Sequence, residues 1–144
     1  MAIVEKSVLI GHSAEKMYAL VADVDAYPQF LPWCSATEVQ VVDAHKAMAT
    51  LHINYHGLRL HFTTENRMEK GALIEMNLVN GPFKHLDGFW RFAPLAEQAC
   101  KVEFRLSYEL SGKLVEKLAG PVFSHIANTF VEVFVKRAVA LYGS

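Results

Sequence analysis

The middle of the chain alternates hydrophobic and polar side chains with a period of two, which is typical of β-strands. Seven segments carry this alternation, the first of them loosely: residues 2–10, 36–43, 46–56, 58–69, 72–79, 85–93 and 99–110. The separators between the six later segments are too short for crossover helices. The pattern therefore predicts that these strands are antiparallel neighbours in a meander.

Two other segments place apolar residues at helical spacing. The first covers about residues 14–22, with Ser13 as the N-cap and Glu15 in the first turn. The second runs from about Lys113 to Tyr142, where an unbroken helix would be about 45 Å long. We expect Gly120-Pro121 to kink it, because a proline cannot donate to the preceding turn. The apolar stripe of this helix consists of Ala119, Val122, Phe123, Ile126, Phe130, Val133, Phe134 and Leu141.

This order of elements predicts an α+β fold. A curved antiparallel sheet of about seven strands wraps the long C-terminal helix, and a short helix follows the first strand. Residues 1–144 are expected to form a single domain, since the chain is long enough to bury a sizeable core without disulfides or metals.

The strand parity that faces the long helix is almost entirely apolar. The few inward positions with polar atoms are Tyr55, Thr64, Asn66 and Tyr108. A concave apolar wall with few polar groups is the usual composition of a small-molecule site, and an ordinary core has the same composition. Both interpretations remain open from the pattern alone.

The segment from Tyr27 to Cys34 reads Tyr-Pro-Gln-Phe-Leu-Pro-Trp-Cys. Each proline fixes its own φ and favours extended backbone at the residue before it. We expect this segment to be stiff, apolar and not helical. It either plugs the core or gates a cavity.

Arg137 lies close to the centre of the apolar stripe of the long helix. A buried charge is costly unless it is paired or solvated. One interpretation is structural: Arg137 reaches solvent at the helix end or pairs with Asp23 or Asp25. The other is that it lies at a pocket mouth and donates to a polar head group.

A second apolar line on the same helix predicts another neighbour. Its members are Val131, Val135, Val139 and Tyr142. The candidates are the helix at 14–22 or the segment at 27–34, and otherwise a partner protein or a membrane surface.

Composition narrows the function classes. An apolar content of 52% with 20% charged residues excludes general disorder, and a net charge of -1 gives no indication of DNA or an anionic membrane as a partner. Cys34 and Cys100 are isolated, so reduced thiols are expected rather than a zinc site or a disulfide. No signal peptide, transit peptide or membrane span is evident, which favours a cytoplasmic protein.

Candidate chemistry is sparse. His52, His56 and His61 alternate with the inward positions and are expected on a solvated outer face. No histidine has a convincing nucleophile beside it, so no catalytic triad and no metal site is predicted. The pattern favours a pocket over a reaction.

Several motifs together resemble the coenzyme Q-binding and RatA-type branch of the START-like superfamily, over nearly the whole chain. In this sequence they read Asp23-Val24-Asp25-Ala26-Tyr27-Pro28-Gln29-Phe30-Leu31-Pro32-Trp33-Cys34, Gly81-Pro82-Phe83-Lys84 with Leu86, Trp90-Arg91-Phe92, and Phe134-Val135-Lys136-Arg137-Ala138. The resemblance implies the helix-grip fold and a hydrophobic tunnel between the sheet and the long helix.

For part of that family the resemblance implies binding of ubiquinone or a related polyprenyl quinone in support of respiration. The first expectation is therefore a non-catalytic binder that shields or transports this ligand and requires no cofactor. The quinone carbonyls are expected to contact Asn66, Tyr55 or Arg137, and the loop at 27–34 to act as a gate. The expected ligand-binding residues are Tyr27, Phe30, Tyr55, Phe62, Asn66, Met76, Trp90, Phe104, Phe123, Ile126, Phe130 and Arg137.

The resemblance also implies two alternatives. One is a ribosome association toxin that binds the large ribosomal subunit and hinders subunit joining. The other is a polyketide cyclase or aromatase, which would need a positioned acid or base that the inward positions barely supply. The absence of a mitochondrial presequence suggests a bacterial protein in the cytoplasm or in transient contact with the inner face of the membrane.

Overall fold

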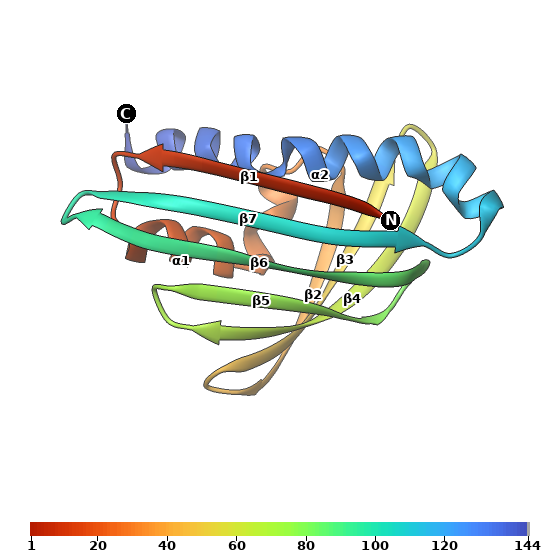
Figure 1. The fold of residues 1–144 in the computed structure, drawn as a ribbon, viewed down its shortest axis with the longest axis horizontal. Coiled ribbons are helices and arrows are strands. Elements are labelled where there is room, and N and C mark those ends of the chain that lie inside the picture. Colours follow the sequence, from red (N-terminus) through yellow and green to blue (C-terminus); the bar gives the residue numbers. More distant parts are fainter. Residues whose placement is uncertain (144) are drawn as a thin grey trace.

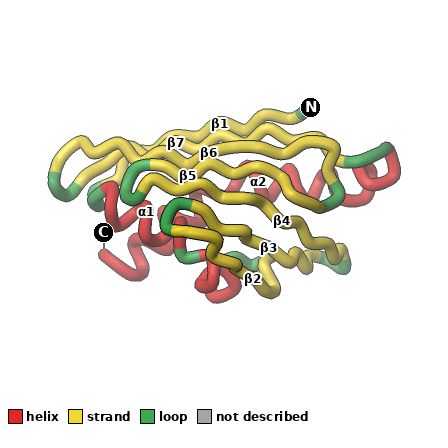
Figure 2. The backbone as a smooth tube through the Cα atoms, turned by 90° about the horizontal axis from the view of Figure 1, so that it is seen from below, coloured by secondary structure: helices red, strands yellow, loops and turns green. Residues whose placement is uncertain are grey.

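The computed structural model describes residues 1–143 and contains one antiparallel sheet of seven strands with a long helix across one face (Figure 1). Figure 2 shows the helices on one side of the sheet. The strands are β1 (Ala2–Ile10), β2 (Cys34–Asp43), β3 (Lys46–Tyr55), β4 (Leu58–Glu69), β5 (Leu73–Asn80), β6 (Phe83–Ala96) and β7 (Ala99–Leu110). The helices are α1 (Ala14–Ala22), the 3₁₀ helix η1 (Val24–Gln29) and α2 (Lys113–Tyr142).

The strand order is β1-β7-β6-β5-β4-β3-β2, and all pairs are antiparallel. Strands β2 to β7 follow one another in space as they do in sequence, which confirms the predicted meander. Strand β1 lies beside β7, with Val8 opposite Val102, and forms one edge of the sheet. The α+β helix-grip architecture expected from the sequence is confirmed.

The apolar parity of β3 to β7 faces the core that α2 covers, whereas β2 is exposed over most of its length. In β7, Cys100, Val102 and Phe104 are almost completely buried, whereas the intervening Lys101 and Glu103 lie on the outer face. The expectation for the outer face also holds: His52 contacts the Glu38 carboxylate at 2.9 Å. The period of two thus fixes which side chains meet the helix.

Helix α1 begins where predicted, and the Ser13 hydroxyl accepts a hydrogen bond from the Lys16 backbone N–H at 3.1 Å. It provides a neighbour for the second apolar line of α2, where Val131 is buried and the Tyr142 hydroxyl donates to the Lys16 carbonyl at 3.4 Å. The predicted stripe is wrong at Leu141, which is 50% exposed. Near its end α2 buries Ala138 instead, because α1 packs beside it there.

The expectation that the segment from Tyr27 is not helical is wrong for its first part. Tyr27 and Pro28 belong to η1, and the Tyr27 carbonyl accepts from the N–H groups of Phe30 and Leu31. The proline φ lies within the range of a 3₁₀ helix, so a short turn accommodates Pro28. The residues after it form a turn, in which the Leu31 carbonyl accepts from the Cys34 N–H at 3.0 Å, and β2 begins at Cys34.

Helix α2 continues through Pro121, and its first turns bend away from the line of the rest (Figure 1). The expected kink at Gly120-Pro121 is consistent with that bend. The helix is long and apolar enough to span a bilayer by length and composition, contrary to the expectation that no segment is, but in this structure it packs on the sheet.

Candidate functional site

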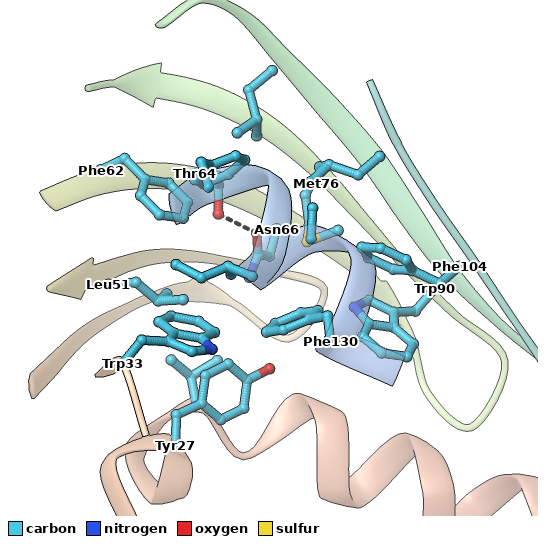
Figure 3. Close-up of a pocket in the computed structure, with 16 residues that line it drawn as sticks. Tyr27, Trp33, Leu51, Phe62, Thr64, Asn66, Met76, Trp90, Phe104 and Phe130 are labelled. Carbon is cyan, nitrogen blue, oxygen red and sulfur yellow. Dashed lines mark hydrogen bonds between the residues drawn. The ribbon is translucent and has the colours of Figure 1, made fainter. Parts of the chain in front are cut away.

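The candidate site is a buried apolar chamber between the sheet and α2 (Figure 3). It has a volume of about 60 Å³, and a second cavity of about 40 Å³ lies next to it. The two cavities share wall residues from η1, β4, β5 and β6: Val24, Tyr27, Asn66, Met76 and Trp90. The two cavities are therefore neighbours, and we refer to them together as the two lobes of the chamber.

Most of the residues predicted as ligand contacts line this chamber. They are Tyr27, Phe62, Asn66, Met76, Trp90, Phe104, Phe123, Ile126 and Phe130. The strand residues reach it because their shared parity points toward α2, and Phe123, Ile126 and Phe130 reach it from the facing stripe of the helix. Their ligand-binding role stays a prediction.

Arg137 does not line the chamber, so its predicted place at the pocket mouth is wrong. Its guanidinium donates to the Gln29 side-chain oxygen at 3.2 Å and lies 4.9 Å from the centre of the Phe30 ring. Neither Asp23 nor Asp25 pairs with it among the ion pairs of residues 1–143. Arg137 is half-buried against the segment around η1, and its Nε is buried without a hydrogen-bond partner among residues 1–143. Its contacts with Gln29 and Phe30 are a variant of the structural interpretation.

Phe30 and Tyr55 also lie outside the chamber wall. The Phe30 ring packs on Tyr27, Phe134 and the Arg137 guanidinium, so it closes the surface above the site. Tyr55 stacks on His125 at the end of β3, with ring centres 6.0 Å apart. Parity placed Tyr55 on the correct face of the sheet, but the strand carries it beyond the chamber.

The wall includes residues that the predicted ligand set omitted. They are Val24, Trp33, Leu51, Thr64, Leu86, Leu106 and Ala127. Leu51, Thr64, Leu86 and Leu106 share the inward parity of the predicted residues, which was a usable signal. Trp33 had no such signal, because it belongs to the irregular segment between η1 and β2.

Phe130 is the centre of an aromatic cluster. Its half-buried ring lies 5.1–6.5 Å from the rings of Tyr27, Trp33, Trp90, Phe104 and Phe134. Most of these pairs are tilted or edge-to-face, the arrangements that aromatic quadrupoles favour. Helix α2 thus inserts the Phe130 ring among rings from η1, from the residue directly before β2, and from the sheet.

The polar atoms of the wall are mostly engaged. The Thr64 hydroxyl donates to the Asn66 side-chain oxygen at 2.7 Å (Figure 3), and the Tyr27 hydroxyl donates to the Val21 carbonyl. Burial raises the pKa of Tyr27 well above its usual value, and the Cys34 and Asp23 charges raise it further. The Trp33 indole nitrogen is buried and finds no hydrogen-bond partner among residues 1–143.

The wall contains no charged side chain, so the chamber favours a neutral occupant. Within residues 1–143 no three His, Cys, Asp or Glu side chains are grouped to hold a metal ion. A Ser107–His85–Asp87 cluster lies on the outer face of the sheet. Ser107 and Asp87 both contact the same ring nitrogen of His85, at 3.3 and 3.1 Å. A catalytic triad needs the two ring nitrogens in separate roles, so this cluster is not one.

Volume limits what the chamber holds as it stands. Pockets for small molecules have volumes of about 300–1,000 Å³. A lobe of about 60 Å³ has room for a few small atoms and not for a polyprenyl chain. Any larger ligand requires the wall to open.

Comparison with known proteins agrees with this architecture. Residues 10–135 match the family model described as polyketide cyclase/dehydrase and lipid transport. The ribosome association toxin RatA of Pseudomonas aeruginosa is 44% identical, with 97% of each chain covered. A mitochondrial coenzyme Q-binding protein of Xenopus laevis is 29% identical, with 96% of this chain and 58% of that protein covered.

Among solved structures, a Streptomyces aromatase/cyclase has a TM-score of 0.80 at 16% identity, with 95% of this chain and 93% of that chain covered. At that identity the likeness shows the fold alone. The family match and the curated relative cover most of this chain, including every element that lines the chamber. The chain therefore belongs to the polyketide cyclase/dehydrase and lipid-transport family of START-like proteins.

Proposed function

We propose that this protein associates with the ribosome, through the large subunit, in the cytoplasm. The observation that carries the proposal is the 44% identity to a protein named as a ribosome association toxin, extending over 97% of both chains. Similarity of this extent covers the outer surface as well as the core. The toxin activity, hindrance of subunit joining, belongs to the same proposal.

Sedimentation tests it. The purified protein is mixed with isolated large subunits, isolated small subunits or joined ribosomes, and centrifuged through gradients at a series of salt concentrations. We expect it to co-sediment with large subunits and to reduce the fraction of joined ribosomes. Contacts to RNA phosphates weaken steeply as salt increases. A protein that stays at the top of every gradient at low salt contradicts the proposal.

A second function, binding of a neutral hydrophobic molecule, is favoured by the chamber itself. Its wall is apolar and aromatic, and the description of the matching family model includes lipid transport. A polyprenyl quinone is the finer proposal. Because the chamber is several times smaller than a usual pocket, quinone binding requires its wall to open, and the part of the 27–34 loop that precedes Trp33 is proposed as the moving gate.

Mass spectrometry of organic extracts from gently purified protein tests this second function. We expect the wild type to carry a stoichiometric apolar molecule. A variant that fills the chamber, Ala127→Phe, should lose it, while Arg137→Leu should keep it because Arg137 lies outside the wall. Empty wild-type protein that also fails to take up added quinone contradicts the proposal.

A cyclase reaction has less support from the chamber. Its wall carries no carboxylate, histidine or lysine to act as an acid or base. The Tyr27 hydroxyl is already bound to the Val21 carbonyl, and its raised pKa makes it a poor proton donor near neutral pH. The structure therefore favours binding over catalysis at this site.

A further inference from the structure

The unpartnered indole of Trp33 points to the chemical class of ligand that the chamber takes. Trp33 is 4% exposed, and its nitrogen has no hydrogen-bond partner among the described residues. Buried indole N–H groups in proteins usually have a partner, so a missing one needs an explanation. The residue is not loosely placed, because its carbonyl accepts from the Asn54 N–H at 2.9 Å and so anchors it to β3.

The indole lies in the chamber wall. Figure 3 shows its nitrogen on the edge of the ring nearest to Phe130, whose ring centre is 5.8 Å from that of Trp33. A neighbouring phenyl ring offers no lone pair to this donor. The place filled by Phe130 is therefore one where a ring carrying an acceptor would form a hydrogen bond that the phenylalanine cannot.

Asn66 is a second wall residue that has a hydrogen-bond donor without a partner within residues 1–143. The Asn66 side-chain oxygen already accepts from Thr64, which leaves the amide NH₂ as the free end of that side chain. Asn66 borders both lobes of the chamber. Two uncommitted donors and no charged group select an uncharged molecule that brings acceptors, and they disfavour amines and carboxylates.

We propose that the chamber binds a neutral, apolar ring compound whose carbonyl or ether oxygen accepts the Trp33 indole N–H, in the space that Phe130 now fills. The proposal rests on the proposed binding of a hydrophobic molecule and names its recognition group. Phe130 is the residue that has to leave, because its ring is half-buried and sits inside a shell of rings that are almost completely buried. Its displacement joins free volume to the two lobes.

A pair of probes of nearly equal shape tests the proposal: menadione, a naphthoquinone with two carbonyl oxygens, and 2-methylnaphthalene, which has none. Affinities are measured by isothermal titration calorimetry. We expect the wild type to prefer menadione by about tenfold, the size of one buried hydrogen bond. Trp33→Phe keeps the apolar ring and removes the donor, so it should abolish that preference and leave the affinity for 2-methylnaphthalene unchanged.

Two further variants keep the result interpretable. Phe130→Ala opens the chamber with Trp33 intact, so it should bind both probes more tightly and retain the preference for menadione. Tyr142→Phe removes a hydroxyl donor from an aromatic ring outside the wall, and it should behave as the wild type. Circular dichroism and thermal unfolding show whether each variant is folded.

The outcomes separate the two claims. A preference for menadione that persists in folded Trp33→Phe overturns the role of the indole and leaves hydrophobic binding standing. Equal wild-type affinities for the two probes overturn it in the same way. Failure of both probes to bind the wild type and Phe130→Ala removes the proposed hydrophobic binding, and this inference with it.

Discussion

Phe134 is the side chain that joins η1 and Phe30 to the rest of the fold. It is 1% exposed, and its ring lies 5.1–5.3 Å from the rings of Tyr27, Phe30, Trp90 and Phe130. These partners come from η1, the residue after it, the sheet and α2. We predict that Phe134→Ala destabilises the protein strongly, because one ring connects all of these elements.

The size of the effect follows from burial. Replacing a buried Phe by Ala costs about 3–5 kcal/mol, and the aromatic pairs place Phe134 in the upper part of that range. A domain of this size has a total stability of roughly 5–15 kcal/mol. At about 3 °C per kcal/mol, the midpoint of thermal unfolding should fall by roughly 10–15 °C.

Urea unfolding followed by circular dichroism measures the change. Phe89→Ala is the matched control, because that ring lies on the outer face of the sheet, half-buried, with Arg91 over it at 4.7 Å. We expect the free energy of unfolding of this control to fall by about 1 kcal/mol or less. If the free energy of unfolding falls no more in Phe134→Ala than in the control, the aromatic cluster does not hold η1 and Phe30 in place, and the prediction is refuted.

Four further predictions have defined outcomes. Gly88→Ala would place a methyl group against the Arg105 carbonyl oxygen, so β6 and β7 must separate. We expect the free energy of unfolding, measured in urea, to fall by about 1–3 kcal/mol. An unchanged midpoint would show that the strands adjust freely. Tyr27→Phe leaves the Val21 carbonyl without its donor and should cost about 1–3 kcal/mol near neutral pH. Burial raises the pKa of Tyr27, so the folded state keeps a proton that the unfolded state releases above about pH 10. Above that pH the stability of the wild type should therefore fall as pH rises, and it should fall more steeply than the stability of Tyr27→Phe. Burial also raises the pKa of Cys34 to about 11, so its thiol should react slowly with a disulfide reagent near neutral pH, and equal rates in native buffer and in concentrated urea would contradict this.

The helices and the strand parity were predictable because each is a local property. Backbone geometry sets the periods of 2 and 3.6, so the buried residues of β7 and the stripe from Ala119 to Phe134 could be identified from spacing alone. The meander followed from separator length, since short connections leave only antiparallel neighbours. Most of the chamber wall could be predicted because it is the sum of these faces.

Residues at the ends of elements were harder to place. Tyr55 and Arg137 do not line the chamber, although spacing assigned both to the inner face, and Leu141 is exposed although spacing assigned it to the apolar stripe. Spacing gives the direction of a side chain and not which neighbour covers it. Helix α1 and the segment around η1 cover the end of α2, and nothing in the spacing of α2 specifies how far they reach.

Trp33 marks the limit of local reasoning. Its position depends on the turn of η1, on two prolines and on a backbone hydrogen bond to β3, so no single period predicts it. The sequence by itself determined the elements, their faces and the apolar character of the interior, because these follow from local geometry and transfer free energy. Only the tertiary structure decided the volume of the chamber, the ring that fills it and the donor left without a partner, because each depends on the packing of segments distant in sequence.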